Sequence, residues 1–91
     1  MVKVIFPSIM TKVTNGEREV TVSASTLLEA LKQLSIRYGD AFKDTIFDSS
    51  GTPNRFLNFY INGKNVRFIN NLNTPISETD ELIILPSATG G

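Results

Sequence analysis

The sequence predicts an α+β domain in which a mixed sheet of four or five strands carries one main helix packed on one face. Three observations lead to this prediction. Apolar, β-branched segments lie near both ends of the chain, an amphipathic helical segment follows the first strands, and Asn62-Gly63 is a strong hairpin turn signal. The 91 residues fit one domain. A chain of this length buries roughly 60–65% of its unfolded surface, enough for a single core.

An N-terminal hairpin is predicted from two short strands. The first covers residues 2–6, and Pro7 ends it because proline cannot donate to a sheet ladder. The second covers residues 19–23, where apolar and polar side chains alternate. Asn15-Gly16 marks a turn between them, within a rather long polar loop.

The main helix is predicted to begin at Thr26, because Thr26 and Glu29 have the spacing of a capping box. Gly39 stands where a left-handed C-terminal cap is expected. A short second helix is predicted over residues 40–47, followed by loop chemistry over residues 48–54. The apolar stripe of the main helix consists of Leu27, Leu31, Leu34 and Tyr38.

The second half of the chain returns to strands. Residues 55–61 and 64–67 flank the Asn62-Gly63 turn, and the last strand, residues 82–85, is apolar at every position. Such a run suits a central strand buried on both faces. The equally apolar first strand is its natural neighbour, which places both terminal strands in the middle of the sheet. With the helix across one face, this arrangement is a β-grasp, the ubiquitin-like fold.

The composition excludes several kinds of active site. The chain has no Cys, His or Trp, so thiol nucleophiles, Cys/His zinc sites and Ser-His-Asp triads are impossible. Nine basic residues balance nine acidic residues, which argues against binding to nucleic acid or to anionic membranes. The sequence shows neither a signal peptide nor a membrane-spanning run, so a cytoplasmic location is expected.

The last five residues, 87–91, form a small, uncharged segment that ends in Gly90-Gly91. No bulky apolar group is available to anchor it, so we expect a globular domain over residues 1–86 and a flexible tail over residues 87–91. Five extended residues reach roughly 16–18 Å. A frayed end is the ordinary interpretation of such a segment. A terminal Gly-Gly after a β-grasp pattern favours a functional tail instead.

Two stretches then resemble a known family. Residues 55–63 with 66–68, and residues 73–76 with 80–86 and the Gly90-Gly91 end, are similar to the MoaD/ThiS ubiquitin-like sulfur carriers. The resemblance spans nearly the whole chain and is nearest to the molybdopterin synthase small subunit and the carrier of cysteine synthesis. It implies that an E1-like adenylyltransferase uses ATP to adenylate the Gly91 carboxylate, which sulfur then converts to a thiocarboxylate. The chain would be a carrier rather than an enzyme, with no bound cofactor or metal.

The resemblance also implies partners and contact residues. The sulfur acceptor would be bound by a molybdopterin synthase large subunit or by a pyridoxal-phosphate-dependent cysteine synthase. Gly90 and Gly91 would enter a narrow channel of the partner, since glycine adopts backbone angles closed to other residues. The small side chains of Ala88 and Thr89 would fit the same channel. Leu85 and Phe68 would contact a partner, although a core position is the ordinary interpretation of each. For the carboxylates of Asp80 and Glu81, a turn role is favoured over catalysis.

Two other functions stay open at this point. In one, the activated Gly91 is joined to lysines of other proteins, as in a ubiquitin-like modifier. In the other, the β-grasp serves as a non-covalent binding module that needs no Gly-Gly end. Deleting Gly90 and Gly91 distinguishes this binding module from the sulfur carrier and the protein modifier, because only those two need the Gly-Gly end.

Overall fold

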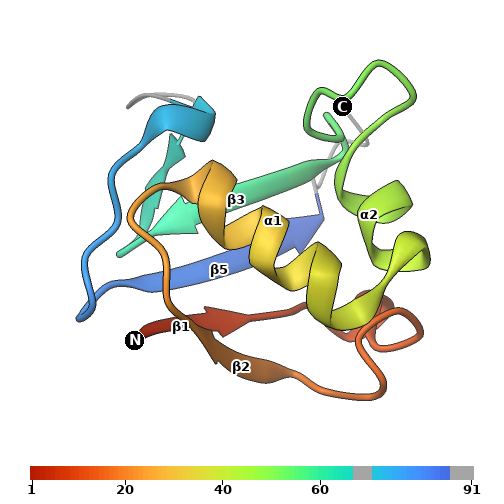
Figure 1. The fold of residues 1–91 in the computed structure, drawn as a ribbon, viewed down its shortest axis with the longest axis horizontal. Coiled ribbons are helices and arrows are strands. Elements are labelled where there is room, and N and C mark those ends of the chain that lie inside the picture. The colour runs from red at the N-terminus through yellow and green to blue at the C-terminus, as the bar shows by residue number, and fades with distance from the viewer. Residues whose placement is uncertain (67–70, 87–91) are drawn as a thin grey trace.

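The computed structural model describes residues 1–66 and 71–86, and it confirms the predicted β-grasp. Five strands form one sheet in the order β2-β1-β5-β3-β4. Figure 1 shows α1 lying across one face of this sheet, with α2 beside its C-terminal end. The elements are β1 (Val2–Ile5), a 3₁₀ turn η1 (Ser8–Met10), β2 (Glu19–Val22), α1 (Leu27–Tyr38), α2 (Asp40–Ile46), β3 (Leu57–Ile61), β4 (Lys64–Asn65), a 3₁₀ turn η3 (Asn71–Asn73) and β5 (Glu81–Pro86).

Strand β5 lies at the centre of the sheet, as predicted. It pairs in parallel with β1, with Ile5 opposite Ile83, and antiparallel with β3, with Leu57 opposite Pro86. These directions bring three chain segments to one end of the sheet, which we call the carboxyl end. They are the last residues of β5, the residues that follow β1 and the residues that precede β3.

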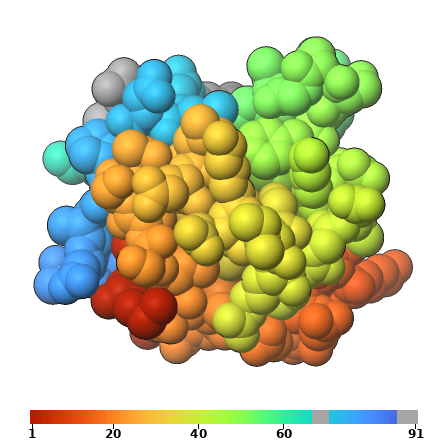
Figure 2. All heavy atoms as spheres, viewed as in Figure 1, coloured from red at the N-terminus to blue at the C-terminus, as the bar shows by residue number. Residues whose placement is uncertain are grey.

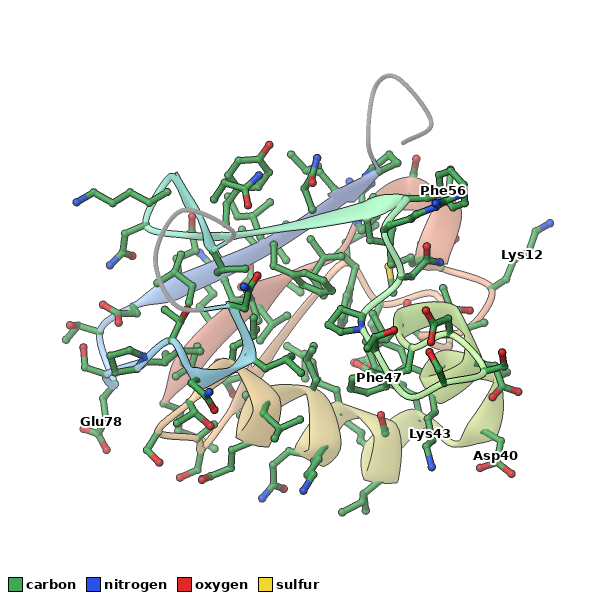
Figure 3. All side chains as sticks on the ribbon, turned by 90° about the horizontal axis from the view of Figure 1, so that it is seen from above. Lys12, Asp40, Lys43, Phe47, Phe56 and Glu78 are labelled. Atoms are coloured by element: carbon green, nitrogen blue, oxygen red, sulfur yellow. The ribbon has the colours of Figure 1, made fainter. Side chains whose placement is uncertain are left out.

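The predicted burial of the last strand on both faces is wrong. Leu82 and Ile84 are 0% exposed beneath α1, but Leu85 is 43% exposed and Ile83 is only half-buried. The two helices lie on the same side of the sheet (Figure 3). The opposite side, which we call the open face, carries no helix among the described residues. An all-apolar strand therefore does not imply two covered faces.

Helix α1 begins as predicted, with one difference in its cap. The Glu29 amide donates to the Thr26 hydroxyl oxygen over 3.2 Å, and the Glu29 carboxylate accepts from the Ser25 hydroxyl over 3.1 Å. In a capping box, the Glu29 carboxylate would accept from the backbone amide of Thr26. Here it accepts instead from a side chain, that of the preceding residue Ser25. At the other end, Gly39 has φ 96° and ψ −168°, a conformation outside the predicted left-handed helical cap. Its positive φ suits glycine and turns the chain directly into α2.

The hairpin turns follow their predicted chemistry. Asn62 and Gly63 both have positive φ, 50° and 85°, as a type I′ turn requires. Asn15 and Gly16 also have positive φ, 56° and 81°, in the loop before β2. Strand β4 after the turn is shorter than the predicted 64–67 and ends at Asn65.

An aromatic cluster joins Phe6, the residue directly after β1, to both helices. Phe6 is fully buried, and its ring meets Tyr38 edge to face at 5.7 Å and Phe42 at 5.9 Å between ring centres. Tyr38 closes the cluster at the surface, where its hydroxyl donates to the Glu17 carboxylate over 2.9 Å. Because these contacts connect the sheet with α1 and α2, this cluster holds the second helix on the domain.

The loop after α2 is organised around one carboxylate. Asp48 accepts hydrogen bonds from the hydroxyl and amide of Ser50, at 2.7 and 2.9 Å, and from the amide and hydroxyl of Thr52, at 3.1 and 2.7 Å. The Ser50 hydroxyl, and then the Thr52 hydroxyl, lower the pKa of Asp48 from 3.8 to about 2, because they stabilise the ionised form.

We expect Asp48→Asn to destabilise the protein in a pH-dependent way. The folded-state pKa lies below the ordinary value, so the carboxylate contributes stability above pH 3.8 and loses it as the pH falls toward 2. The difference in urea midpoint between wild type and variant should be largest at neutral pH and shrink over that range. Asp44→Asn, which makes the same charge change on α2, is the control. A wild-type-to-variant difference that stays constant with pH would contradict the assignment.

Candidate functional site at the carboxyl end of the sheet

Of the residues predicted to act on partners, Leu85 is the one that the structure describes. Gly91, Gly90, Thr89, Ala88 and Phe68 lie outside the described residues, and their roles stay predictions. Leu85 is exposed on the open face, paired with Asn58 of β3. The ordinary core interpretation of Leu85 is therefore wrong, and its side chain is available for contact.

Exposed apolar side chains concentrate near Leu85. Across residues 1–66 and 71–86, five large hydrophobic side chains are exposed, and three of them belong to the carboxyl end. Phe56, 46% exposed, immediately precedes β3, and Ile9 lies in the turn after β1. We call Ile9, Phe56, Leu85 and Pro86 the tail root, because residues 87–91 follow directly from it. Sequence reasoning missed Ile9 and Phe56, since only the sheet register brings them to this end.

The open face continues the apolar surface from the tail root along the sheet. Ile5, Ile83 and Tyr60 are half-buried and lie side by side on three neighbouring strands, with Ile83 paired to each of the other two. At its edge, the Lys3 ammonium lies 3.5 Å from the Glu19 carboxylate and 3.9 Å from that of Glu81. A partner that covers this face meets an apolar centre with a charged border.

The opposite end of β5 begins at a turn, which confirms the turn role predicted for Asp80, whereas Glu81 is the first residue of the strand. The Asp80 carboxylate accepts from the Ser77 amide over 2.9 Å and from the Asn62 side-chain amide over 2.8 Å. These bonds, led by that from Ser77, lower the pKa of Asp80. The Glu81 amide donates to the Asn62 side chain over 3.0 Å. Asp80 therefore fixes the start of β5.

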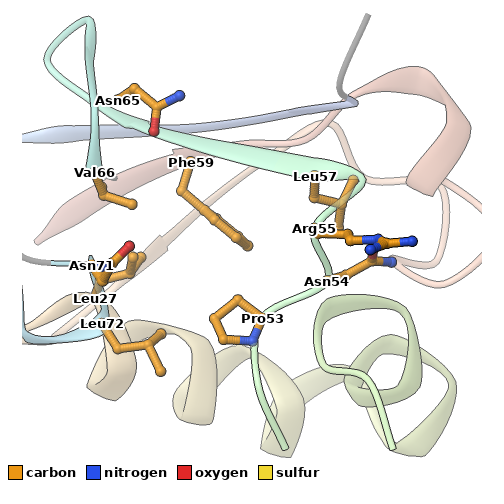
Figure 4. Close-up of a pocket in the computed structure, with 10 residues that line it drawn as sticks. All are labelled: Leu27, Pro53, Asn54, Arg55, Leu57, Phe59, Asn65, Val66, Asn71 and Leu72. Atoms are coloured by element: carbon orange, nitrogen blue, oxygen red, sulfur yellow. The ribbon is translucent and has the colours of Figure 1, made fainter. Parts of the chain in front are cut away.

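Two hollows lie on the helix side of the sheet. The smaller, of about 160 Å³, is lined by apolar and amide side chains between α1 and β3, with Arg55 as its one ionisable lining residue (Figure 4). The larger, of about 910 Å³, opens on the helix side shown in Figure 2, where Leu28, Ile36 and Phe47 form its apolar part. Carboxylates and serine hydroxyls also line the larger hollow, but the one carboxylate there with printed hydrogen bonds, Asp48, is engaged by the hydroxyls and amides of its own loop.

Two further kinds of site are missing from the described ranges 1–66 and 71–86. There, no group of three or more carboxylates, histidines or cysteines is placed to hold a metal ion. No helix in the same ranges is long and apolar enough to cross a membrane.

The fold and the exposed apolar end define a ubiquitin-like β-grasp protein. The model of the ThiS family matches residues 4–91, and the chain belongs to that family. The sulfur carrier protein CysO of Mycobacterium tuberculosis is 35% identical over 91 residues, which cover 99% of this chain and 98% of that protein. The resemblance noted in the sequence is thereby confirmed.

Solved structures agree with this assignment. The crystal structure of the Amycolatopsis orientalis BexX/CysO complex contains a chain with a TM-score of 0.86 and 31% identity, covering 100% of both chains. The solution structure of small archaeal modifier protein 1 from Methanosarcina acetivorans has a TM-score of 0.85 and 29% identity, covering 99% of this chain and 95% of that one. The likeness therefore extends to both carrier and modifier proteins.

Proposed function

We propose that this chain carries sulfur as a thiocarboxylate on Gly91 and delivers it to cysteine synthesis. The supporting observation is the 35% identity to the CysO sulfur carrier, which extends over 99% of this chain. The molybdopterin pathway has no comparable support among these relatives. The chain itself acts as a protein substrate in the cytoplasm, with no bound cofactor, and the catalytic groups belong to its partners.

The chemistry needs two steps before sulfur is delivered. The Gly91 carboxylate attacks the α-phosphorus of ATP on an E1-like adenylyltransferase, which releases pyrophosphate and forms an acyl adenylate. Sulfide then attacks the acyl carbon and displaces AMP, leaving the thiocarboxylate. Its sulfur is a stronger nucleophile than the original oxygen. It is offered to an electrophile bound by a pyridoxal-phosphate-dependent cysteine synthase.

The tail root suits this delivery. We propose that residues 87–91 extend from the domain formed by residues 1–86. Extended, they reach roughly 16–18 Å beyond Pro86, far enough to enter a partner channel. Leu85 and Phe56 would rest against the mouth of that channel while Ala88, Thr89 and Gly90 pass through it. Phe68 stays a predicted contact.

Intact-mass spectrometry tests the thiocarboxylate. After incubation with the adenylyltransferase of the same organism, ATP and sulfide, the protein should gain the mass difference between sulfur and oxygen. Trypsin should place the gain on residues 68–91, because no Lys or Arg follows Arg67. An unchanged mass with active enzyme present would refute the proposal.

We expect Leu85→Asp to lower kcat/KM for adenylation roughly tenfold, because a charge replaces an apolar contact at the mouth of the channel. Pyrophosphate release measures the effect. Ile36→Asp is the matched control, since Ile36 is 82% exposed on the helix side and away from the tail root. Both variants should keep the urea midpoint of the wild type. Equal activity of the two variants would show that Leu85 does not contact the enzyme.

A second candidate function is protein modification, favoured by the 29% identity to small archaeal modifier protein 1. The same adenylate would then react with a lysine amine and form an isopeptide bond. Trypsin would leave residues 68–91 on the target lysine rather than a Gly-Gly remnant. Mass spectrometry of cell extracts for this branched peptide separates the two functions.

A further inference from the structure

Asn54 joins helix α2 to the turn before β3 through four hydrogen bonds. Its backbone amide donates to the Ile46 carbonyl over 2.8 Å, and its Nδ2 donates to the Thr45 carbonyl over 3.1 Å. Its Oδ1 accepts from the Phe56 amide over 2.8 Å, and its carbonyl accepts from the Leu57 amide over 3.1 Å. Figure 4 shows Asn54 just before the start of β3. Every polar group of this half-buried residue is therefore engaged.

These bonds meet needs on both sides of Asn54. Thr45 and Ile46 are the last two residues of α2, and the final carbonyls of a helix have no partner inside it. Asn54 donates to both of them. On the other side, the bond from Leu57 closes a β-turn over residues 54–57, and the bond from Phe56 adds an Asx-turn within it. One side chain thus fixes the turn relative to the helix.

The residue held by this turn belongs to the tail root. Phe56 is 46% exposed, so the packing of the domain covers only part of its side chain. Figure 3 shows it at the edge of the molecule. Helix α2, in contrast, is anchored in the core by Phe42, which is 0% exposed and packs against Phe6. Asn54 therefore connects a fixed helix to an exposed aromatic residue beside the tail.

We propose that Asn54 is a positioning residue, which holds Phe56 in place for contact with the adenylating enzyme. This inference rests on the proposed function and adds a residue that acts on the enzyme through Phe56. A contact residue that is already ordered costs less conformational entropy on binding. Loss of the Asn54 side chain should therefore weaken binding of the carrier and raise KM. It should leave kcat unchanged, because the acyl carbon of Gly91 is not affected.

A double-mutant cycle tests whether Asn54 acts through Phe56. Wild type, Asn54→Ala, Phe56→Ala and the double variant are assayed with the purified adenylyltransferase of the same organism, by pyrophosphate release. Two residues that act as a unit give losses that do not add. Urea midpoints verify folding. If Asn54→Ala does not fold, Asn54→Gln takes its place, since its longer side chain keeps the amide but displaces both bonds.

The matched control is Asn62→Gly, at the far end of the sheet. The Asn62 side chain also donates one hydrogen bond and accepts one, with Asp80 and the Glu81 amide. Glycine suits the positive φ of this position, 50°. The control should lower the urea midpoint, as Asn54→Ala does, but leave kcat/KM unchanged.

Asn54→Ala should lose about fivefold in kcat/KM with kcat unchanged, the effect of one side chain that must be ordered on binding. Phe56→Ala should lose about tenfold, and the double variant no more than Phe56→Ala alone. Asn54→Ser should recover most of the activity, because its hydroxyl can accept from the Phe56 amide in the same kind of turn.

Three results would overturn the inference while leaving adenylation intact. They are an unchanged kcat/KM in Asn54→Ala or in Phe56→Ala, losses that multiply in the double variant, and an equal loss in Asn62→Gly. A wild-type protein that is not adenylated would refute the proposed function itself, and this inference with it.

Discussion

Deleting Gly90 and Gly91 is expected to abolish adenylation completely while leaving the domain as stable as before. The described core does not use these residues, and Leu82 and Ile84 beneath α1 remain in place. The free energy of unfolding should therefore change by no more than about 0.5 kcal/mol. The two measurements are pyrophosphate release with the adenylyltransferase and urea unfolding of the same preparation.

A subtler pair of substitutions tests why the end consists of glycines. Gly90→Ala adds a Cβ inside the proposed channel, and we expect roughly a hundredfold loss in adenylation rate if the acyl carbon is displaced by about 1 Å. Ala88→Gly removes a Cβ from the same tail and should retain activity.

The deletion also tests the non-covalent binding module. If the variant that lacks Gly90 and Gly91 keeps full activity in a cellular sulfur-transfer assay, the result favours that module over the carrier.

Replacing Phe6 with alanine is expected to be the most destabilising of the substitutions considered. Phe6 is 0% exposed and contacts the rings of Tyr38 and Phe42, so its loss leaves a cavity between the end of β1 and both helices. Such substitutions cost about 3–5 kcal/mol, a large part of the roughly 5–15 kcal/mol that stabilises a domain. Urea unfolding followed by circular dichroism measures the change.

Phe56→Ala is the matched control for that experiment. The same side-chain truncation at a 46% exposed position should cost about 1 kcal/mol or less. If Phe6→Ala does not fold at all, Phe6→Leu should show a smaller loss of about 1–2 kcal/mol, because it leaves a smaller cavity. Equal costs at the two phenylalanines would contradict the packing described for Phe6.

Local chemistry accounts for the parts of the fold that could be predicted from the sequence. The Thr26 hydroxyl starts a helix because it satisfies an amide three residues on, and Asn62-Gly63 forms its turn because both residues accept positive φ. These signals depend on a few neighbouring residues, so they can be recognised without knowing the rest of the structure.

The tail root could be predicted only in part, since it depends on contacts between distant segments. Leu85 belongs to an apolar run that reads as core, because the sequence does not say which face of a strand α1 will cover. Ile9 and Phe56 are isolated hydrophobic residues, each unremarkable in its own segment. Only the pairing of β5 with β1 and β3 places them at one end of the sheet. Their exposure is therefore a result of tertiary structure.

The central position of β5 has a consequence for the folding of the chain. In the order β2-β1-β5-β3-β4, this strand alone connects the β1-β2 hairpin to the β3-β4 hairpin. Its pairing with β1 joins residues separated by nearly the whole chain, a contact whose loop-closure entropy slows folding. During synthesis, the two hairpins cannot join into one sheet until β5 has been translated. This strand directly precedes residues 87–91. A chain that lacks β5 cannot assemble this sheet, so only chains translated through this strand can bring Ile9, Phe56 and Leu85 to one end of it.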